Sequence, residues 1–128
     1  MAIKRCPADA AFSTAVRMSR GNTCEHCGRQ DGQLELSHTY GRRAKSVRWD
    51  TLNGLCLCHH CHMVFTENPI QFTQWLQQYV GQGYLDILNE KRNQIFKTTQ
   101  AIRKDIAKHY RAQIKLMEAG QHDLVSYQ

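Results

Sequence analysis

The chain has 128 residues, a formal net charge of +6, and 41% hydrophobic and 22% charged residues, which is typical of one soluble domain. It has no apolar run near the ~20 residues that a transmembrane helix needs, and no apolar segment follows the charged first residues as in a secretory signal. We therefore expect a cytoplasmic protein, in which six cysteines are better suited to metal binding than to disulfides.

Positive charge is unevenly distributed along the chain. Residues 51–90 contain no lysine or arginine, whereas residues 91–115 contain eight basic residues and one acid. A second basic stretch, without any acid, holds Arg42, Arg43, Lys45 and Arg48. Segregation of this kind favours a polyanion such as nucleic acid as the partner. A basic surface that serves only solubility is the alternative.

A short helix is expected over residues 8–19, directly after Pro7. Phe12 and Val16 lie on one apolar stripe at helical spacing. We expect this helix to pack against the cysteine-rich region that follows it. Residues 1–22 thus form an N-terminal helical segment with a structural role.

A hairpin followed by a helix is predicted in the middle of the chain. Residues 34–38 alternate apolar and polar side chains, as a half-buried strand does, and this strand ends on His38. Residues 39–50 show neither the helical period nor the alternation of a strand, and they are expected to form a loop. The apolar run 55–57 could pair antiparallel with the first strand, and the chain can turn helical over about residues 59–65.

Three further helices are predicted in the C-terminal extension, residues 67–120. The first begins with Asn68 as its cap and ends at Gly81. The others cover about residues 84–92 and 98–117.

The long last helix has an apolar face and, roughly opposite, a basic face. The apolar face is either core or the seam of a homodimer. The basic face is either a solvated surface or a set of contacts with DNA phosphates, through Lys104, Lys108 and Arg111. The tail, residues 121–128, has little pattern and is expected to fray.

Two Cys-x-x-Cys pairs enclose the predicted hairpin. Their cysteines can supply four thiolates to one tetrahedral zinc ion, and four sulfurs leave no position for substrate. We therefore predict a structural zinc ion bound by Cys24, Cys27, Cys58 and Cys61.

Other thiols and imidazoles near these pairs are assigned no metal. Cys56 offers a rival to Cys58, but it lies inside the apolar strand and is interpreted as core, with Cys6 as a spare thiol. The neighbouring histidines, interpreted as surface groups or as neighbours of the ligands, are His26, His59 and His60.

The region 23–66 resembles the H-N-H endonucleases. The resemblance rests on four motifs: Cys24-x-x-Cys27-Gly28, Ser37-His38, Asp50-x-x-Asn53 and Cys58-x-x-Cys61-His62. The basic insert Gly41-Arg42-Arg43 and Ser46-x-Arg48-Trp49-Asp50, with Asn68-Pro69-x-x-Phe72-x-x-Trp75 after it, is similar to a phage branch, the NinG/Rap-like recombination nucleases.

The resemblance implies an α+β fold, in which a zinc-stapled ββα-metal (HNH) finger is flanked by helices. It also implies hydrolysis of DNA phosphodiester bonds, with branched recombination intermediates as substrates. His38 would be the general base, and Asn53 would hold the loop and the His38 ring in position. His62 would bind the catalytic ion, Mg²⁺ or Mn²⁺.

One position departs from the family pattern. Many members place an Asp or a His, as a second metal ligand, where this chain has Ser37. A hydroxyl is a weak ligand, so the ion is expected to bind loosely or to recruit a ligand from elsewhere, and other divalent transition metals are open.

The DNA-contacting residues expected beside this site are Arg42, Arg43, Lys45 and Arg48, through backbone phosphates. Trp49 is expected to pack under the loop. Two hypotheses follow for the 128-residue domain as a whole: a DNA endonuclease encoded by a phage and acting in its bacterial host, or a zinc-stabilised DNA-binding module without nuclease activity.

Overall fold

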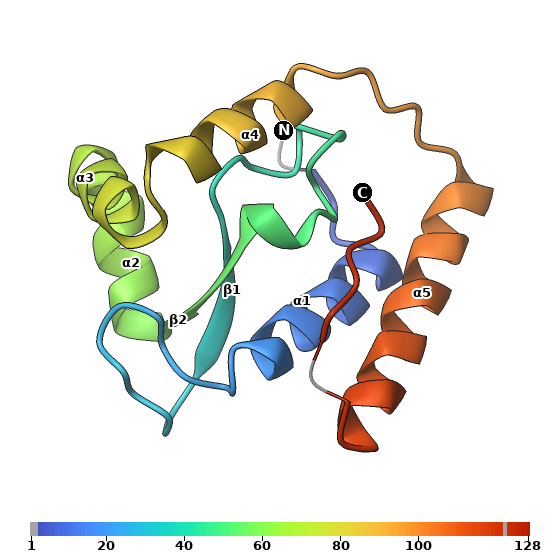
Figure 1. The fold of residues 1–128 in the computed structure, drawn as a ribbon, viewed down its shortest axis with the longest axis horizontal. Coiled ribbons are helices and arrows are strands. Elements are labelled where there is room, and N and C mark those ends of the chain that lie inside the picture. The colour runs from blue at the N-terminus through green and yellow to red at the C-terminus, as the bar shows by residue number, and fades with distance from the viewer. Residues whose placement is uncertain (1–2, 122) are drawn as a thin grey trace.

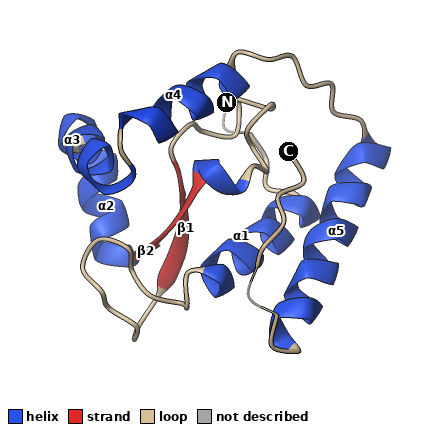
Figure 2. Cartoon of the chain, in the orientation of Figure 1, coloured by secondary structure: helices blue, strands red, loops and turns tan. Residues whose placement is uncertain are grey.

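A two-stranded antiparallel hairpin lies at the centre of the chain, and helices surround it (Figures 1 and 2). The computed structural model describes residues 3–121 and 123–128; the parts of the predicted segments that fall on residues 1, 2 and 122 lie outside it. Strand β1 (Leu34–His38) pairs with β2 (Gly54–Cys58), with His38 opposite Gly54. The predicted hairpin is confirmed. Over the described residues the fold is a small α+β arrangement of five α-helices and this sheet.

Helix α1 (Pro7–Ser19) packs against one side of the hairpin and against α5 (Gln100–Glu118). The helix begins with Pro7 in its first turn, where the missing N–H costs nothing. Phe12 and Val16 are fully buried. The helix packs on the hairpin of the cysteine-rich region, as predicted, at the end that carries His38 and Gly54, and it also packs on α5, which was not predicted.

Gly54 allows this close approach. A Cβ atom at Gly54 would lie 3.1 Å from Leu36 Cδ1 and 3.3 Å from Val16 Cγ1. These distances are shorter than ordinary van der Waals contacts, so a larger residue would push α1 and the hairpin apart. Gly54 therefore sets how near α1 can lie to His38.

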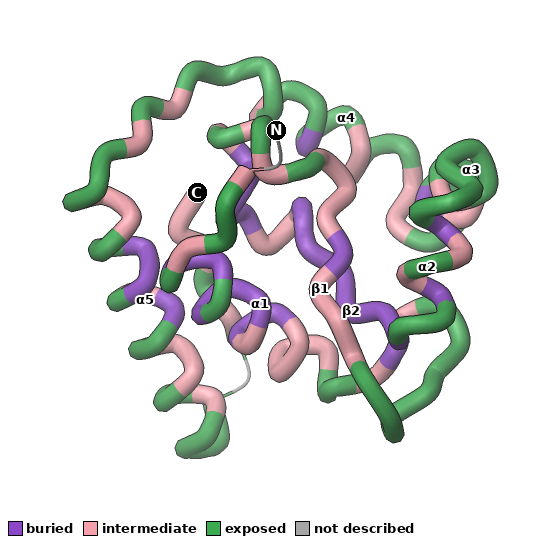
Figure 3. Tube along the Cα trace, turned by 180° about the vertical axis from the view of Figure 1, so that it is seen from behind, coloured by how far each residue is buried: buried purple, intermediate pink, exposed green. Residues whose placement is uncertain are grey.

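The apolar face of α5 is buried within the chain. Ile106 and Tyr110 are fully buried against α1 and Trp49, while Lys104, Lys108 and Arg111 are exposed on the outer face. Figure 3 shows the buried and exposed positions alternating along α5. Of the two interpretations of the apolar face, core and dimer seam, the core is the one observed.

Helices α2 (His59–Glu67), α3 (Pro69–Val80) and α4 (Gln82–Arg92) follow the hairpin and lie on its other side (Figure 1). They form at the predicted positions. Asn68 is the N-cap residue of α3, as predicted, but its side chain accepts no hydrogen bond from α3 and instead donates to the Val64 carbonyl at 2.7 Å. A short 3₁₀ turn, Thr51–Asn53, leads into β2. Of the helices that the structure describes, none is long and apolar enough to cross a membrane.

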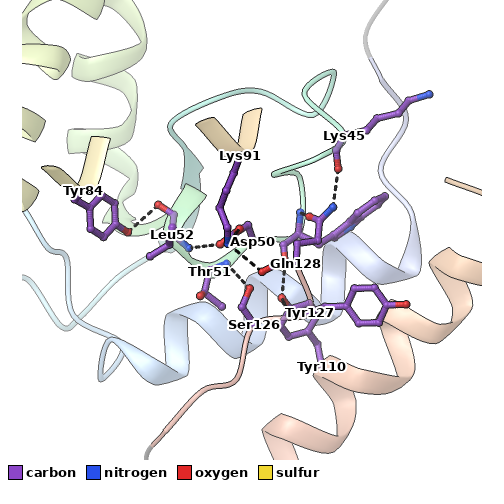
Figure 4. A network of polar contacts seen from close by, with 11 residues as sticks. Lys45, Asp50, Thr51, Leu52, Tyr84, Lys91, Tyr110, Ser126, Tyr127 and Gln128 are labelled. Atoms are coloured by element: carbon purple, nitrogen blue, oxygen red, sulfur yellow. Dashed lines mark hydrogen bonds and ion pairs between the residues drawn. The ribbon is translucent and has the colours of Figure 1, made fainter. Parts of the chain in front are cut away.

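Residues 123–128 of the tail are not frayed, contrary to the sequence-based expectation. Residues 123–128 run back to the loop before β2, and Figure 4 shows their hydrogen bonds. The Gln128 side chain accepts from the Trp49 N–H at 2.7 Å, and the Ser126 hydroxyl accepts from the Thr51 N–H at 3.0 Å. Lys91 Nζ bonds both Asp50 Oδ2, at 2.5 Å, and the Gln128 carbonyl, at 3.2 Å. The tail therefore holds the segment that leads to Asn53.

The Tyr110 hydroxyl joins three parts of this network, because it donates to the Trp49 carbonyl and accepts from the Tyr127 N–H at 3.0 Å. We predict that Tyr110→Phe lowers the free energy of unfolding by about 1–3 kcal/mol, since it leaves two buried backbone groups without a partner. Urea unfolding followed by circular dichroism measures this loss. The control is Tyr127→Phe, which removes an exposed hydroxyl that donates to Asp105, and its loss should stay within about 0.5 kcal/mol. Equal losses in the two variants would contradict the prediction.

Candidate functional site

The four predicted zinc ligands come together. Cys24 and Cys27 lie in the turn after α1, Cys58 ends β2, and Cys61 lies in the first turn of α2. Their Sγ atoms all lie within 4.8 Å of one another, and the Cys27 and Cys58 sulfurs are 3.7 Å apart. A tetrahedral zinc ion with ~2.3 Å bonds requires sulfurs roughly 3.8 Å apart. The cluster could therefore hold a structural zinc ion.

Local backbone geometry points these sulfurs inward. Gly28 adopts a φ of 80°, which an L side chain rarely does, and its N–H donates to the Cys24 carbonyl at 2.9 Å. Burial raises the pKa of the Cys24 thiol, but backbone N–H groups near the sulfur outweigh burial and lower this pKa to about 7. Cys56 is fully buried, and burial raises the pKa of its thiol to about 11. Cys56 is thus core, as predicted.

Glu25, between the first two cysteines, fastens their turn to the rest of the fold. Its side chain is 5% exposed and accepts hydrogen bonds from Arg20, from the Cys56 N–H and from the Tyr79 hydroxyl, each at 2.7 Å. His26 Nδ1 lies 3.2 Å from Cys61 Sγ, with its ring against Phe65. The prediction that nearby histidines are neighbours of the ligands is confirmed for His26.

We predict one zinc ion per chain by mass spectrometry of the purified protein. Cys61→Ser should abolish the zinc and lower the melting temperature, because structural zinc contributes directly to folding free energy. Cys6→Ser, a thiol outside the cluster, is the matched control and should retain the zinc. Retention of zinc in Cys61→Ser would contradict the four-cysteine assignment.

A cavity of about 530 Å³ lies between α1, β1 and the first turn of α2. His38 and His62 both line it, so the structure brings these two predicted residues to one site. Its ionisable lining also includes Arg5, Asp9, Arg17, Glu35 and Arg42. Arg5, Arg17 and Glu35 were missed, because nothing local in the sequence places them beside His38.

His38 ends β1 with its ring stacked on Phe12, the ring centroids 6.2 Å apart. Burial, followed by the charge of Arg42, lowers the pKa of His38 to about 4. The imidazole is therefore neutral at pH 7. Its Nε2 is the one buried side-chain nitrogen or oxygen without a hydrogen bond in the described part of the chain. Leaving such an atom unpaired costs about 1–3 kcal/mol, so its presence calls for a chemical explanation.

Asn53 fastens the loop that follows His38. Its side chain is fully buried, its Nδ2 donates to the Tyr40 carbonyl at 2.8 Å, and its Oδ1 accepts from the Tyr40 N–H at 2.7 Å. The Asn53 carbonyl also accepts from the Thr39 N–H at 3.0 Å. These bonds support the predicted role of Asn53 in holding the loop. They involve Thr39 and Tyr40 and not the His38 ring, so they fix that ring only by fixing the backbone next to it.

Glu35 of β1 contacts two of the three histidines of α2. Its carboxylate lies 2.8 Å from His62 Nδ1 and 2.9 Å from His59 Nδ1. Hydrogen bonds from His59 and His62 outweigh burial and lower the pKa of Glu35. Because the Nδ1 of His62 is bonded to Glu35, the lone pair of its Nε2 stays available to a metal ion.

His62 and Glu35 therefore form a pair of an imidazole and a neighbouring carboxylate in the cavity. Ser37 does not belong to it, because Ser37 is buried opposite Leu55 in the hairpin and does not line the cavity. Ser37 as a weak ligand finds no support in this position. Among the described residues, the four cysteines are the one group of three or more potential metal donors whose ligand atoms converge.

Arg48 corrects the predicted set of phosphate-contacting residues. Its side chain is 7% exposed and bonds Asp9 twice, at 2.6 and 3.0 Å, with the guanidinium 4.6 Å from the Trp49 ring centroid. A buried arginine paired in this way cannot reach a DNA backbone. Trp49 is fully buried and donates its ring N–H to Asp9 at 3.1 Å, so it packs under the loop as predicted.

The other predicted basic residues lie at the surface or in the cavity. Arg42 lines the cavity and donates to the Ile3 carbonyl at 3.3 Å, and Arg43 and Lys45 are exposed on the loop after it. The three residues of α5 that were predicted to contact DNA, Lys104, Lys108 and Arg111, do not line this cavity. Arg42 is thus the predicted basic residue nearest to the two histidines.

Comparisons with known families, curated proteins and solved structures find no match for this chain. The functional evidence is the arrangement of its own side chains. That arrangement combines a neutral histidine, a histidine oriented by a carboxylate, and three arginines in one cavity.

The lowered pKa of His38 predicts a pH dependence. An unfolded histidine titrates near 6.5 and folded His38 near 4, so the unfolded chain binds the extra proton between these values. The neutral His38 ring makes its full contribution to the free energy of unfolding above about pH 6.5, and this contribution is lost as pH falls toward 4. At pH 5 the loss is on the order of 2 kcal/mol.

Comparing urea unfolding of wild type and His38→Gln at pH 7 and pH 5 isolates this contribution, because both proteins share the acid sensitivity of the cysteine cluster. The NMR titration of the His38 ring should show a midpoint near 4. A midpoint near 6.5 would contradict the burial argument.

Proposed function

We propose that this chain is a metal-dependent DNA endonuclease of HNH type, built on a ββα-metal finger formed by β1, β2 and α2. One observation carries the proposal: His38, at the end of β1, and His62, in α2, line the same cavity, while Asn53 fastens the loop after His38. This order and placement agree with the roles that the family resemblance assigns to these three residues.

The chain's own groups support hydrolysis of a phosphodiester bond. His38 is the general base that accepts a proton from the attacking water, and it is ready to do so at pH 7 because burial keeps it neutral. Arg5, Arg17 and Arg42 attract and orient the phosphate in the cavity. Asn53 holds the backbone beyond His38, so the base keeps its position.

His62 is the proposed ligand of the catalytic Mg²⁺ or Mn²⁺. Glu35 orients its ring through Nδ1, which leaves Nε2 for the ion. When bound, the ion supplies stabilisation of the negative charge that develops on the phosphate and the leaving oxygen. With Ser37 outside the cavity, the carboxylates that line it together with His62 are those of Asp9 and Glu35.

The resemblance to phage recombination nucleases extends the proposal to branched recombination intermediates as substrates. Resolving such a junction requires cuts in two strands, which favours a homodimer. Its seam must lie outside the apolar face of α5, because α1 covers that face within the chain.

The alternative function is a zinc-stabilised DNA-binding module without nuclease activity. The observation that favours it is Ser37, which stands where many family members carry a metal ligand and is buried away from the cavity. In this case the four cysteines still bind the structural zinc ion and the basic surface still contacts DNA, but His38 and His62 take no part in catalysis.

Plasmid nicking in Mg²⁺ or Mn²⁺ distinguishes the two functions. We predict that wild type nicks supercoiled plasmid and that His38→Ala lowers the rate at least about 100-fold, because general base catalysis contributes that much or more. His109→Gln, on α5 and far from the cavity lining, is the control and should leave the rate unchanged. DNA binding that persists without nicking in any divalent metal would replace the endonuclease by the binding module.

A further inference from the structure

We propose that one strand of the DNA leaves the cavity past Arg42 and lies in a basic channel between the loop 40–46 and the end of α4. We name this surface the Arg92 channel; its principal residues are Tyr40, Arg42, Arg43, Lys45 and Arg92. The inference rests on the proposed function and specifies where the DNA is held outside the cavity. Arg92 and Tyr40 did not stand out in the sequence as DNA contacts.

The channel is continuous with the cavity. A hollow of about 530 Å³ adjoins the cavity, and Arg42 lines both. A further hollow of about 350 Å³ shares Arg43 and Arg92 with the first. A strand whose phosphate lies beside His38 can therefore continue along these hollows.

The charge of the channel suits a phosphodiester backbone. Its lining carries four cations and, among the described residues that line it, no aspartate or glutamate. Lys45 and Arg92 are exposed, so approaching phosphates can reach them. Contacts of this kind are independent of sequence and release counterions from the DNA.

The channel is also preformed. The Arg92 guanidinium lies 5.0 Å from the centroid of the Tyr40 ring, which offers a base or sugar a flat surface next to a positive charge. The Ser46 hydroxyl donates to the Arg92 carbonyl at 2.9 Å and so ties the loop to the end of α4. Figure 1 shows this loop beside the end of α4. Because Asn53 also holds the Tyr40 backbone, the channel and the base His38 share one support.

A rival basic groove lies between α5 and the start of α1, where Arg103, Lys104 and Arg111 line a space of about 560 Å³. This groove shares no lining residue with the cavity, so a strand cleaved beside His38 would have to leave the groove to reach it. Continuity with the cavity is what favours the Arg92 channel.

Fluorescence anisotropy of a labelled DNA duplex, measured without added divalent cation so that no cleavage occurs, tests the channel. We expect Arg92→Gln and Lys45→Gln each to weaken binding about 3- to 10-fold at moderate salt. Each should also reduce the slope of log affinity against log salt by about 0.9, the value for one lost phosphate contact. Arg92→Lys keeps the charge and should keep the slope. Lys104→Gln, from the rival groove, is the comparison variant, and the channel predicts that it changes both quantities less than either channel variant does.

Unchanged affinity and slope in both channel variants, or a larger loss in Lys104→Gln, would overturn the channel. Absence of salt-dependent binding by wild type would also overturn it. The nicking assay is independent of these outcomes: loss of binding through Arg92 without any nicking keeps the channel and removes the endonuclease, whereas nicking with no effect of Arg92 keeps the endonuclease and removes the channel.

Discussion

The four-cysteine cluster joins segments that lie far apart in the chain, since Cys27 and Cys58 are 31 residues apart. A small hairpin with one helix buries too little apolar surface to be stable by itself, and a metal ion that closes a long loop compensates for that. Cys58 ends β2 and Cys61 begins α2, so the same ion that closes the loop would also set the angle at which α2 leaves the sheet. His62 follows directly, and its position depends on that angle.

The opposite end of the hairpin is held without metal. Asp9 accepts from Arg48, from the Trp49 ring and from the Cys6 N–H, so one buried carboxylate joins α1 to the loop before β2. The ion pair between Asp9 and Arg48 is bidentate, and Asp9 accepts further hydrogen bonds. A buried ion pair needs such contacts to offset the cost of its desolvation. Residues 126–128 and Lys91 fasten the same loop from outside (Figure 4). The end of the hairpin that carries His38 and Asn53 is therefore held by two independent sets of contacts, those of Asp9 and those of the tail with Lys91.

The cavity lies between these two ends of the hairpin and combines side chains that neither end provides alone. His38 is neutral because it is buried, with its ring stacked on Phe12, and the cavity lining carries arginines from α1, the N-terminal segment and the loop after β1. Glu35 balances part of this charge and orients His62. The proposed hydrolysis would use this combination of a neutral imidazole and an electropositive lining.

Local sequence determined the strands, the helices after them and the cysteine cluster, because side-chain periodicity, Pro69 and Gly81 act within a few residues and Cys-x-x-Cys spacing is local geometry. It also placed His38 at the end of the first strand. Tertiary structure alone decided that Arg48 is buried by Asp9, that α1 packs on α5, and that the tail docks. It also brought Arg5, Arg17 and Glu35 to the histidines. Each of these depends on which distant segments meet, and the charge or polarity of a residue does not reveal that partner.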